Sequence, residues 1–251
     1  MIFRLSVLLS QCVFLYSIDV NCQIETPSFK DYNDLYKHFE LEYGSDPNII
    51  NGIRYYDFYA NAEGHPFLED TINYNTLIEI DGIQYDNIAL SYDIFEQHLI
   101  VHDNNEKHQP LKIIINNNEV SSFQLNKRQF RAYVSNNEEP MFYEEVALGK
   151  ISCLYHWIKT RNTLLYDRDV VSYKYSHPIK NSYLYVNGKF HQYKNNRTFC
   201  RLFSKDICNL LEAYLNDNSI NIRTASNKQI RELINYCNSL SSNTASIIQT
   251  Q

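Results

Sequence analysis

Glycine is scarce in this chain, which has six among 251 residues. Loops that hold phosphates or dinucleotides need closely spaced glycines, because the backbone must approach the ligand without a side chain in between. The spaced signatures of serine hydrolases, zinc peptidases, and P-loop or dinucleotide-binding proteins do not occur either. The sequence therefore predicts no cofactor, and it favours a non-enzymatic protein over an enzyme.

Clustered positive charge is also lacking. The formal net charge is −6, with 23 basic and 29 acidic side chains. The densest basic group is Lys127-Arg128 with Arg131. A protein that binds nucleic acid neutralises phosphates with several clustered Lys and Arg side chains. Nucleic acid is therefore not an expected partner.

Long apolar runs are lacking after residue 22. At the N-terminus, Arg4 precedes the apolar stretch Leu5–Tyr16, a pattern typical of a secretory signal peptide. A membrane anchor is disfavoured because the stretch falls short of the roughly 20 apolar residues that cross a bilayer. We expect cleavage of residues 1–22 and a mature chain without a transmembrane span. The predicted location is exported, whether periplasmic, outer-membrane-associated or secreted.

Acylation of Cys22 is an alternative fate for the same signal. A lipoprotein would have small or aliphatic residues just before the modified cysteine, whereas Asp19 and Asn21 stand there. We therefore expect ordinary cleavage, with Gln23 as the mature N-terminus.

Four cysteines follow residue 22, namely Cys153, Cys200, Cys208 and Cys237. An oxidising compartment favours disulfides, but four cysteines allow three pairings and none of the spacings is C-x-x-C. Free cysteine also behaves as a small apolar side chain. At least one disulfide and four buried thiols are both compatible with the sequence.

Most of the chain has the pattern of short antiparallel strands. Residues 23–50 are polar and are expected to form a leader segment; after them, runs rich in Tyr, Ile and Val alternate with turn residues. We expect strands at 53–60, 76–80, 83–92, 97–101, 111–115, 120–125, 128–134, 142–148, 152–159 and 170–175, followed by a hairpin of 183–186 with 189–191. The pattern predicts a β-rich α+β fold, an antiparallel meander forming a rolled or sandwiched sheet in a single domain over residues 51–240.

Two dipeptides mark hairpins. Asp81-Gly82 and Asn187-Gly188 each stand between two β-like runs. A type I′ turn needs positive φ at both central residues, and these residue pairs supply it.

The period becomes helical after Lys194, which predicts two to three C-terminal helices that cap the sheet from about residue 196. Ser204 is expected to cap the first long helix, and Ser226 with Gln229 forms a capping box for the last. The apolar stripes are Ile207, Leu210, Leu211 and Tyr214, and then Ile230, Leu233, Ile234 and Cys237. Residues 241–251 are polar and are expected to be a disordered tail.

Glu63-Gly64-His65-Pro66-Phe67 is the most distinctive short segment, with Glu69 and Asp70 just after it. A histidine held by a neighbouring carboxylate can act as a general base near neutral pH. No nucleophile motif accompanies His65. The favoured interpretation is a structural corner in which His65 hydrogen-bonds a backbone carbonyl; catalysis by His65 with Glu63, Glu69 or Asp70 is the weaker alternative.

A second group of polar residues could bind metal. His102, Asp103, Glu106 and His108 fall within one short segment. His98 is excluded from this group because His98 and His102 are four residues apart in a β-like run. Four residues of a strand span about 13 Å, so these two histidines cannot share an ion. A solvated loop is the preferred interpretation, and the sequence predicts no metal.

The 21 tyrosines are the most conspicuous excess. Exposed rings can stack on sugars or contact a protein partner. Most of the tyrosines fall in β-like runs, where aromatic side chains cover the pleated surface of a sheet. We expect them to serve core and cross-strand packing.

Several segments together resemble a family of exported Bacteroidota proteins to which no function has been assigned. The segments are Asn51-Gly52 with Tyr55 and Tyr59, Gly64-His65-Pro66-Phe67, Tyr92-Asp93-Ile94, Phe142-Tyr143-Glu144-Glu145-Val146 with Gly149-Lys150, and the hairpin and helix of 183–203. The resemblance implies a location in a Gram-negative cell envelope, and it implies no catalytic residue, cofactor or ligand.

The leading hypothesis is a non-enzymatic envelope protein that binds a protein, lipid or glycan partner through its β-sheet. One alternative is a hydrolase that acts on envelope polymers with His65 and a nearby carboxylate. The other is a structural component of an envelope assembly that pairs through a sheet edge.

Overall fold

The computed structural model describes residues 52–57, 59, 61–104, 110–134, 139–166 and 170–241. All of them belong to the second of the two units into which the chain divides, residues 45–251. The predicted signal peptide, leader segment and most of the predicted tail lie outside the described residues. Residue 241 itself ends a helix.

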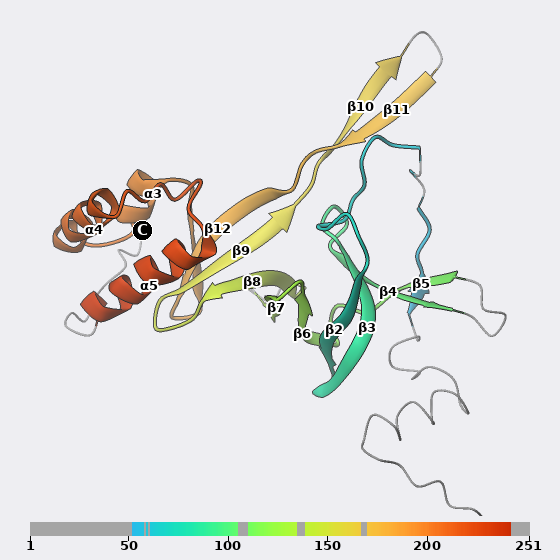
Figure 1. Cartoon of the computed structure of the whole chain (residues 1–251), viewed down its shortest axis with the longest axis horizontal. Helices are drawn as coiled ribbons and strands as arrows, with labels where there is room; N and C mark the ends of the chain where they lie inside the picture. The colour runs from blue at the N-terminus through green and yellow to red at the C-terminus, as the bar shows by residue number, and fades with distance from the viewer. Residues whose placement is uncertain are drawn as a thin grey trace, which may run out of the picture. The chain divides into compact units, whose positions relative to one another are not determined.

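Eleven antiparallel strands form one open sheet (Figure 1). They are β1 (Ile53–Arg54), β2 (Asn73–Ile80), β3 (Ile83–Asp93), β4 (His98–Asn104), β5 (Pro110–Ile114), β6 (Val120–Leu125), β7 (Arg128–Tyr133), β8 (Met141–Ala147), β9 (Ser152–Ile158), β12 (Ile179–Val186) and β13 (Lys189–Tyr193). Their order in the sheet is β1-β5-β4-β3-β2-β6-β7-β8-β9-β12-β13. Strands β10 (Arg161–Tyr166) and β11 (Val170–Tyr175) pair with each other in a separate hairpin.

Both predicted hairpin turns are confirmed. Asp81 and Gly82 have φ of 49° and 77°, and Asn187 and Gly188 have φ of 50° and 77°. The left-handed backbone at all four residues matches the twist of the strands that each turn joins. These turns fix the registers Ile80↔Ile83 and Val186↔Lys189.

The first predicted strand was too long. Only Ile53–Arg54 pairs with β5, and Tyr55–Asp57 leave the sheet after Tyr55 N–H donates to the Lys112 carbonyl at 2.9 Å. The sequence also failed to predict β10, whose polar start, Arg161-Asn162-Thr163, hides the alternation of a strand. β12 begins four residues before the predicted hairpin.

One part of the core lies on the strands from β3 to β8. Phe123 and Phe130 stack with ring centroids 4.8 Å apart. The Tyr92 ring packs edge-on against both, and the Phe142 ring packs edge-on against Phe123 and Tyr92. All four side chains are almost fully buried. Burial of rings of this size contributes about 2–3 kcal/mol each, which makes this cluster a main source of stability for this part of the sheet.

Three helices follow the sheet: α3 (Asn196–Cys200), α4 (Lys205–Asp217) and α5 (Asn227–Ser241). The predicted capping box of α5 is confirmed, because Ser226 N–H donates to Gln229 Oε1 at 3.0 Å and Gln229 N–H donates to Ser226 Oγ at 3.3 Å. Ser204 stands at the N-cap of α4, but its side chain makes no capping hydrogen bond.

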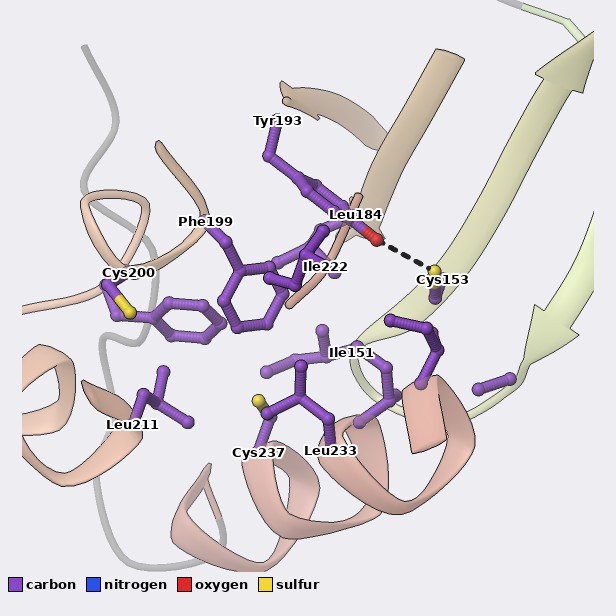
Figure 2. Packing of buried hydrophobic residues seen from close by; sticks show 14 of the residues in the cluster. Ile151, Cys153, Leu184, Tyr193, Phe199, Cys200, Leu211, Ile222, Leu233 and Cys237 are labelled. Carbon is purple, nitrogen blue, oxygen red and sulfur yellow. Dashed lines mark hydrogen bonds between the residues drawn. The ribbon is translucent and has the colours of Figure 1, made fainter. Parts of the chain in front are cut away.

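A second core, which we call the helical core, joins the helices to β8, β9, β12 and β13 (Figure 2). The predicted stripe of α5 is confirmed, since Ile230, Leu233, Ile234 and Cys237 are all buried. On α4 the buried residues are Ile207, Leu211 and Leu215, while Leu210 is 48% exposed and does not belong to the stripe.

Asn238 fastens α5 to the turn between β8 and β9. Its side-chain amide donates to the Ile151 carbonyl and accepts from the Ile151 N–H, both at 2.9 Å. A Cβ on Gly149 would come within 2.6 Å of Asn238 Nδ2, so a larger residue at position 149 would displace the Asn238 side chain. The β-rich α+β class with antiparallel strands and C-terminal helices is thus confirmed.

Candidate functional site

Five aromatic side chains gather on one face of the sheet. We call Tyr133, Tyr143, Tyr183, Tyr185 and Phe190 the aromatic face. They come from β7, β8, β12 and β13. Phe190 lies at the centre, with its ring centroid 4.7 Å from Tyr143, 4.8 Å from Tyr185, 5.9 Å from Tyr133 and 6.0 Å from Tyr183.

Strand alternation places the aromatic face opposite the helices. On β12, Leu184 and Val186 belong to the helical core, so Tyr183 and Tyr185 between them point to the other side. Tyr185 lies directly opposite Phe190 in the pairing of β12 with β13. Because the helices pack on the opposite side, every ring except that of Tyr143 stays partly exposed.

An ion pair borders the aromatic face. Glu145 Oε1 accepts from Arg131 Nε at 3.0 Å and from the Tyr133 hydroxyl at 2.9 Å. Burial, and then the bond to Glu145, raise the pKa of Tyr133, so its phenol stays protonated and donates to the carboxylate. The face therefore combines a fixed aromatic surface with a positive, half-exposed Arg131 at its border.

For the four tyrosines of the aromatic face, these ring contacts confirm the interpretation as cross-strand packing residues. The sequence did not predict that these rings lie together on a single face of the sheet. The signal was present in Tyr183-Leu184-Tyr185-Val186, where tyrosine alternates with aliphatic residues, but four strands had to be placed in register before the face could be recognised.

His65 lies at a backbone corner. Its Nε2 is 2.8 Å from Asp70 Oδ1, while its Nδ1 accepts the Phe67 N–H at 3.2 Å. Acceptance at Nδ1 places the proton of the neutral ring on Nε2, which donates to Asp70. Both ring nitrogens are therefore already engaged, and the Asp70 side chain is 92% exposed rather than enclosed in a pocket.

Lys159 stabilises the same corner. Its Nζ donates to the carbonyls of His65 and Phe67, both at 2.8 Å, and its side chain is buried. Burial lowers the pKa of Lys159. These contacts shape residues 65–67 into a rigid turn, and they favour a structural role for His65.

The other two carboxylates of this segment point to different partners. Glu63 pairs with Lys174 of β11, and Glu69 pairs with Arg128 of β7 at 2.9 Å. Among the sequence-predicted catalytic candidates, the structure thus brings together only His65 and Asp70.

Only two of the four candidate metal ligands predicted from the sequence lie within the described residues. His102 and Asp103 are neighbours on β4 and so point to opposite faces, while Glu106 and His108 lie outside the described residues. His102 Nε2 contacts Ser91 Oγ at 2.8 Å. Burial, and then the charge of Lys112, lower the pKa of His102 to about 4, which keeps this ring neutral at physiological pH.

A buried polar cluster links the two parts of the core. Glu144 Oε2 accepts from Arg128 Nη2 and from Trp157 Nε1, both at 2.7 Å, and Asn227 Nδ2 donates to the other carboxylate oxygen at 3.2 Å. Arg128 bridges onward to Glu69 and lies 4.8 Å from the Trp157 ring centroid. Every member is paired, so the cluster fixes the sheet to the start of α5.

All four cysteines that follow residue 22 are free thiols in the structure, three of them buried and Cys208 partly exposed. Cys153 Sγ lies 3.1 Å from the Tyr193 hydroxyl in the helical core (Figure 2). Burial raises the pKa of Cys153 to about 12. This thiol is therefore a packing residue rather than a nucleophile.

Two hollows are found at polar surfaces of the sheet. One, of about 280 Å³, is lined by β12, β13 and the segment that follows α4, with Lys180, Lys194 and Arg223 among its residues. The other, of about 360 Å³, lies between β2 and the β6–β7 turn. Neither is lined by a ring of the aromatic face.

No family model, curated protein or solved structure matches this chain. Within the described ranges, no helix has both the length and the apolar character needed to cross a membrane.

Proposed function

We propose that this chain is an exported protein of the cell envelope that acts by binding, without catalysis, and that its partner is a protein held against the aromatic face. The observation that carries the proposal is the packed, partly exposed group of five aromatic rings on the side of the sheet away from the helices. Export is supported by the signal-like N-terminus.

The composition of the aromatic face supports a protein partner. Tyrosine, phenylalanine and arginine are enriched where proteins meet, and Tyr and Arg often contribute most of the binding energy. The rings already pack against one another, so little side-chain entropy is lost when a partner covers them. Arg131, 48% exposed on its side chain, adds charge at the border.

The shape of the surface also favours a protein over a small molecule. Small ligands prefer concave pockets that enclose most of their surface. The rings come from four of the five adjacent strands β7-β8-β9-β12-β13, and neither described hollow is lined by them. A protein surface fits such a platform better than a small molecule does.

Site-specific photo-cross-linking in intact cells tests the binding surface. A benzophenone amino acid replaces Tyr185 in the aromatic face, or Ile83, which is 52% exposed at the distant β2–β3 turn, as the matched control. We expect one discrete protein adduct from position 185 and none from position 83. A second substitution, Phe190→Ser, should abolish the adduct while circular dichroism shows that the chain is still folded.

Several outcomes would contradict the proposal. They are the same adduct from both positions, an adduct that survives Phe190→Ser, and a glycan or lipid adduct in place of a protein. Export is tested separately by the intact mass of the cellular protein, which should correspond to a chain that begins at Gln23.

The hydrolase remains a second candidate because of the contact between His65 and Asp70. It predicts that His65→Ala abolishes turnover of an envelope polymer while the melting temperature stays unchanged. A lower melting temperature together with unchanged polymer turnover would instead support a structural role for His65 in the turn at residues 65–67.

A further inference from the structure

Two cysteines and a glutamate converge where α3 meets α4. Cys200 is the last residue of α3, and Cys208 and Glu212 lie on α4. The two sulfur atoms and a Glu212 carboxylate oxygen all lie within 4.8 Å of one another. Cys208 Sγ is 3.8 Å from Glu212 Oε1.

Rigid helical backbone positions all three side chains. Cys208 and Glu212 are four residues apart, so they share one face of α4. Cys200 is held in the helical core beside Phe199 (Figure 2). The short helix α3 is itself fixed by a reciprocal capping box between Asn195 and Thr198.

We propose that Cys200, Cys208 and Glu212 form a binding site for a thiophilic divalent cation, of which Zn²⁺ is the representative. Tetrahedral Zn²⁺ with bonds of about 2.3 Å to sulfur and about 2.0 Å to oxygen places its ligand atoms about 3.5–3.8 Å apart. The separations in the structure approach this geometry, so small rotations of the side chains complete the site.

The ligand set determines which cations bind. Two thiolates favour Zn²⁺ or Cd²⁺ over Mg²⁺ and Ca²⁺, which prefer oxygen ligands. Three protein ligands leave a fourth coordination position for water. That position faces solvent, because Glu212 is exposed and Cys208 is only partly buried.

Binding has a proton balance that can be measured. The ordinary pKa of a cysteine side chain is about 8.5, so both sulfurs are mostly thiols at neutral pH. When the cation binds, each thiol loses its proton to solvent, and the two sulfur atoms donate as thiolates. One bound ion therefore releases two protons.

Titration calorimetry of the reduced mature chain with Zn²⁺, in two buffers of different ionisation enthalpy, tests the site. We expect one ion per chain, with two protons released. Cd²⁺ should produce a thiolate-to-metal absorption band. Loss of an outer-shell partner typically weakens a metal site about 10- to 100-fold, so loss of a direct ligand in Cys208→Ser should cost at least about 100-fold.

Glu212→Gln provides a second, surface variant that leaves the core intact, and we expect affinity about 10-fold weaker or more. Its matched control is Glu232→Gln on α5, also exposed, which should bind as the unmodified chain does. Circular dichroism melting of each variant verifies that it is folded.

Three results would overturn the proposal: no absorption band with Cd²⁺ in the fully reduced protein, Zn²⁺ affinity that Cys208→Ser and Glu212→Gln leave unchanged, or peptide mass mapping without reduction that shows a disulfide between Cys200 and Cys208 in the cellular protein. A disulfide would remove both thiolate ligands at once.

Discussion

Arg128 Nη2 lies 2.7 Å from Glu144 Oε2, and the Glu144 side chain is only 3% exposed. A carboxylate removed from water to this extent needs several donors, and Arg128, Trp157 and Asn227 supply them. The pair therefore connects β7 and β8 with β9 and with the first residue of α5.

Glu144→Gln tests the strength of this connection. Glutamine keeps the shape of the side chain but carries no charge. Its NH₂ group takes the place of a carboxylate oxygen and faces the donor groups of the surrounding side chains, so hydrogen bonds are lost. We expect the free energy of unfolding to fall by about 2–4 kcal/mol, measured by urea denaturation followed by circular dichroism.

Glu63→Gln is the matched control for that change. Glu63 also belongs to an ion pair, with Lys174, but both of these side chains are at least half-exposed. Surface pairs of this kind contribute about 0–1 kcal/mol, so the control should remain close to the unmodified chain. Equal effects of the two substitutions would contradict the structural role of Glu144.

Lys159→Met tests how the corner at residues 65–67 is held. Methionine replaces the apolar stem but leaves the His65 and Phe67 carbonyls without their donor. We expect a loss of about 1–3 kcal/mol in thermal or urea unfolding. Lys189→Met, at an exposed residue of β13, should be neutral within about 0.5 kcal/mol.

Asn238→Ala should loosen α5 specifically. Both hydrogen bonds to Ile151 are lost, and we expect destabilisation of about 1–3 kcal/mol with faster amide hydrogen exchange in α5. Asn216→Ala, an exposed asparagine on α4, is the control. Faster exchange spread evenly over the sheet would show that Asn238 does not act as a local fastener.

His102 should make stability sensitive to acid. Its pKa in the folded state is about 4, below the ordinary value of 6.5, so between these pH values only the unfolded chain binds the proton. Stability should therefore fall as the pH drops from 6.5 toward 4.

In His102→Gln, the free energy of unfolding should fall by about 1–2 kcal/mol less between pH 6.5 and pH 4 than in the unmodified chain, after allowance for partial exposure of the ring. Some slope will remain, because burial also lowers the pKa values of His156 and His191. An unaltered slope in His102→Gln would refute the role of His102.

Local features of the fold were predictable from the sequence, whereas long-range pairings were not. Asp81-Gly82 and Asn187-Gly188 define their turns by backbone preference alone, and Ser226 with Gln229 defines a helix start. By contrast, Glu69 pairs with Arg128 rather than with its neighbour His65. Proximity in the sequence suggested a cluster of His65 with three carboxylates, of which the fold keeps only Asp70 beside His65.

The sequence predicted neither the aromatic face nor the proposed cation site, for two different reasons. The aromatic face depends on the register of β7, β8, β12 and β13, which no single stretch of sequence contains. Cys200, Cys208 and Glu212 are close in the sequence, but their spacing matches no familiar ligand motif. Their convergence becomes visible only once α3 and α4 are docked.

The buried cluster also gives the protein an optical reporter. Trp157 is the only tryptophan in the chain, and its indole donates to Glu144 while the Arg128 guanidinium lies over the ring. Its emission therefore reports on one defined junction rather than on an average over the whole fold. A red shift of that emission at low denaturant, ahead of the loss of circular dichroism, would show this junction opening before the sheet unfolds.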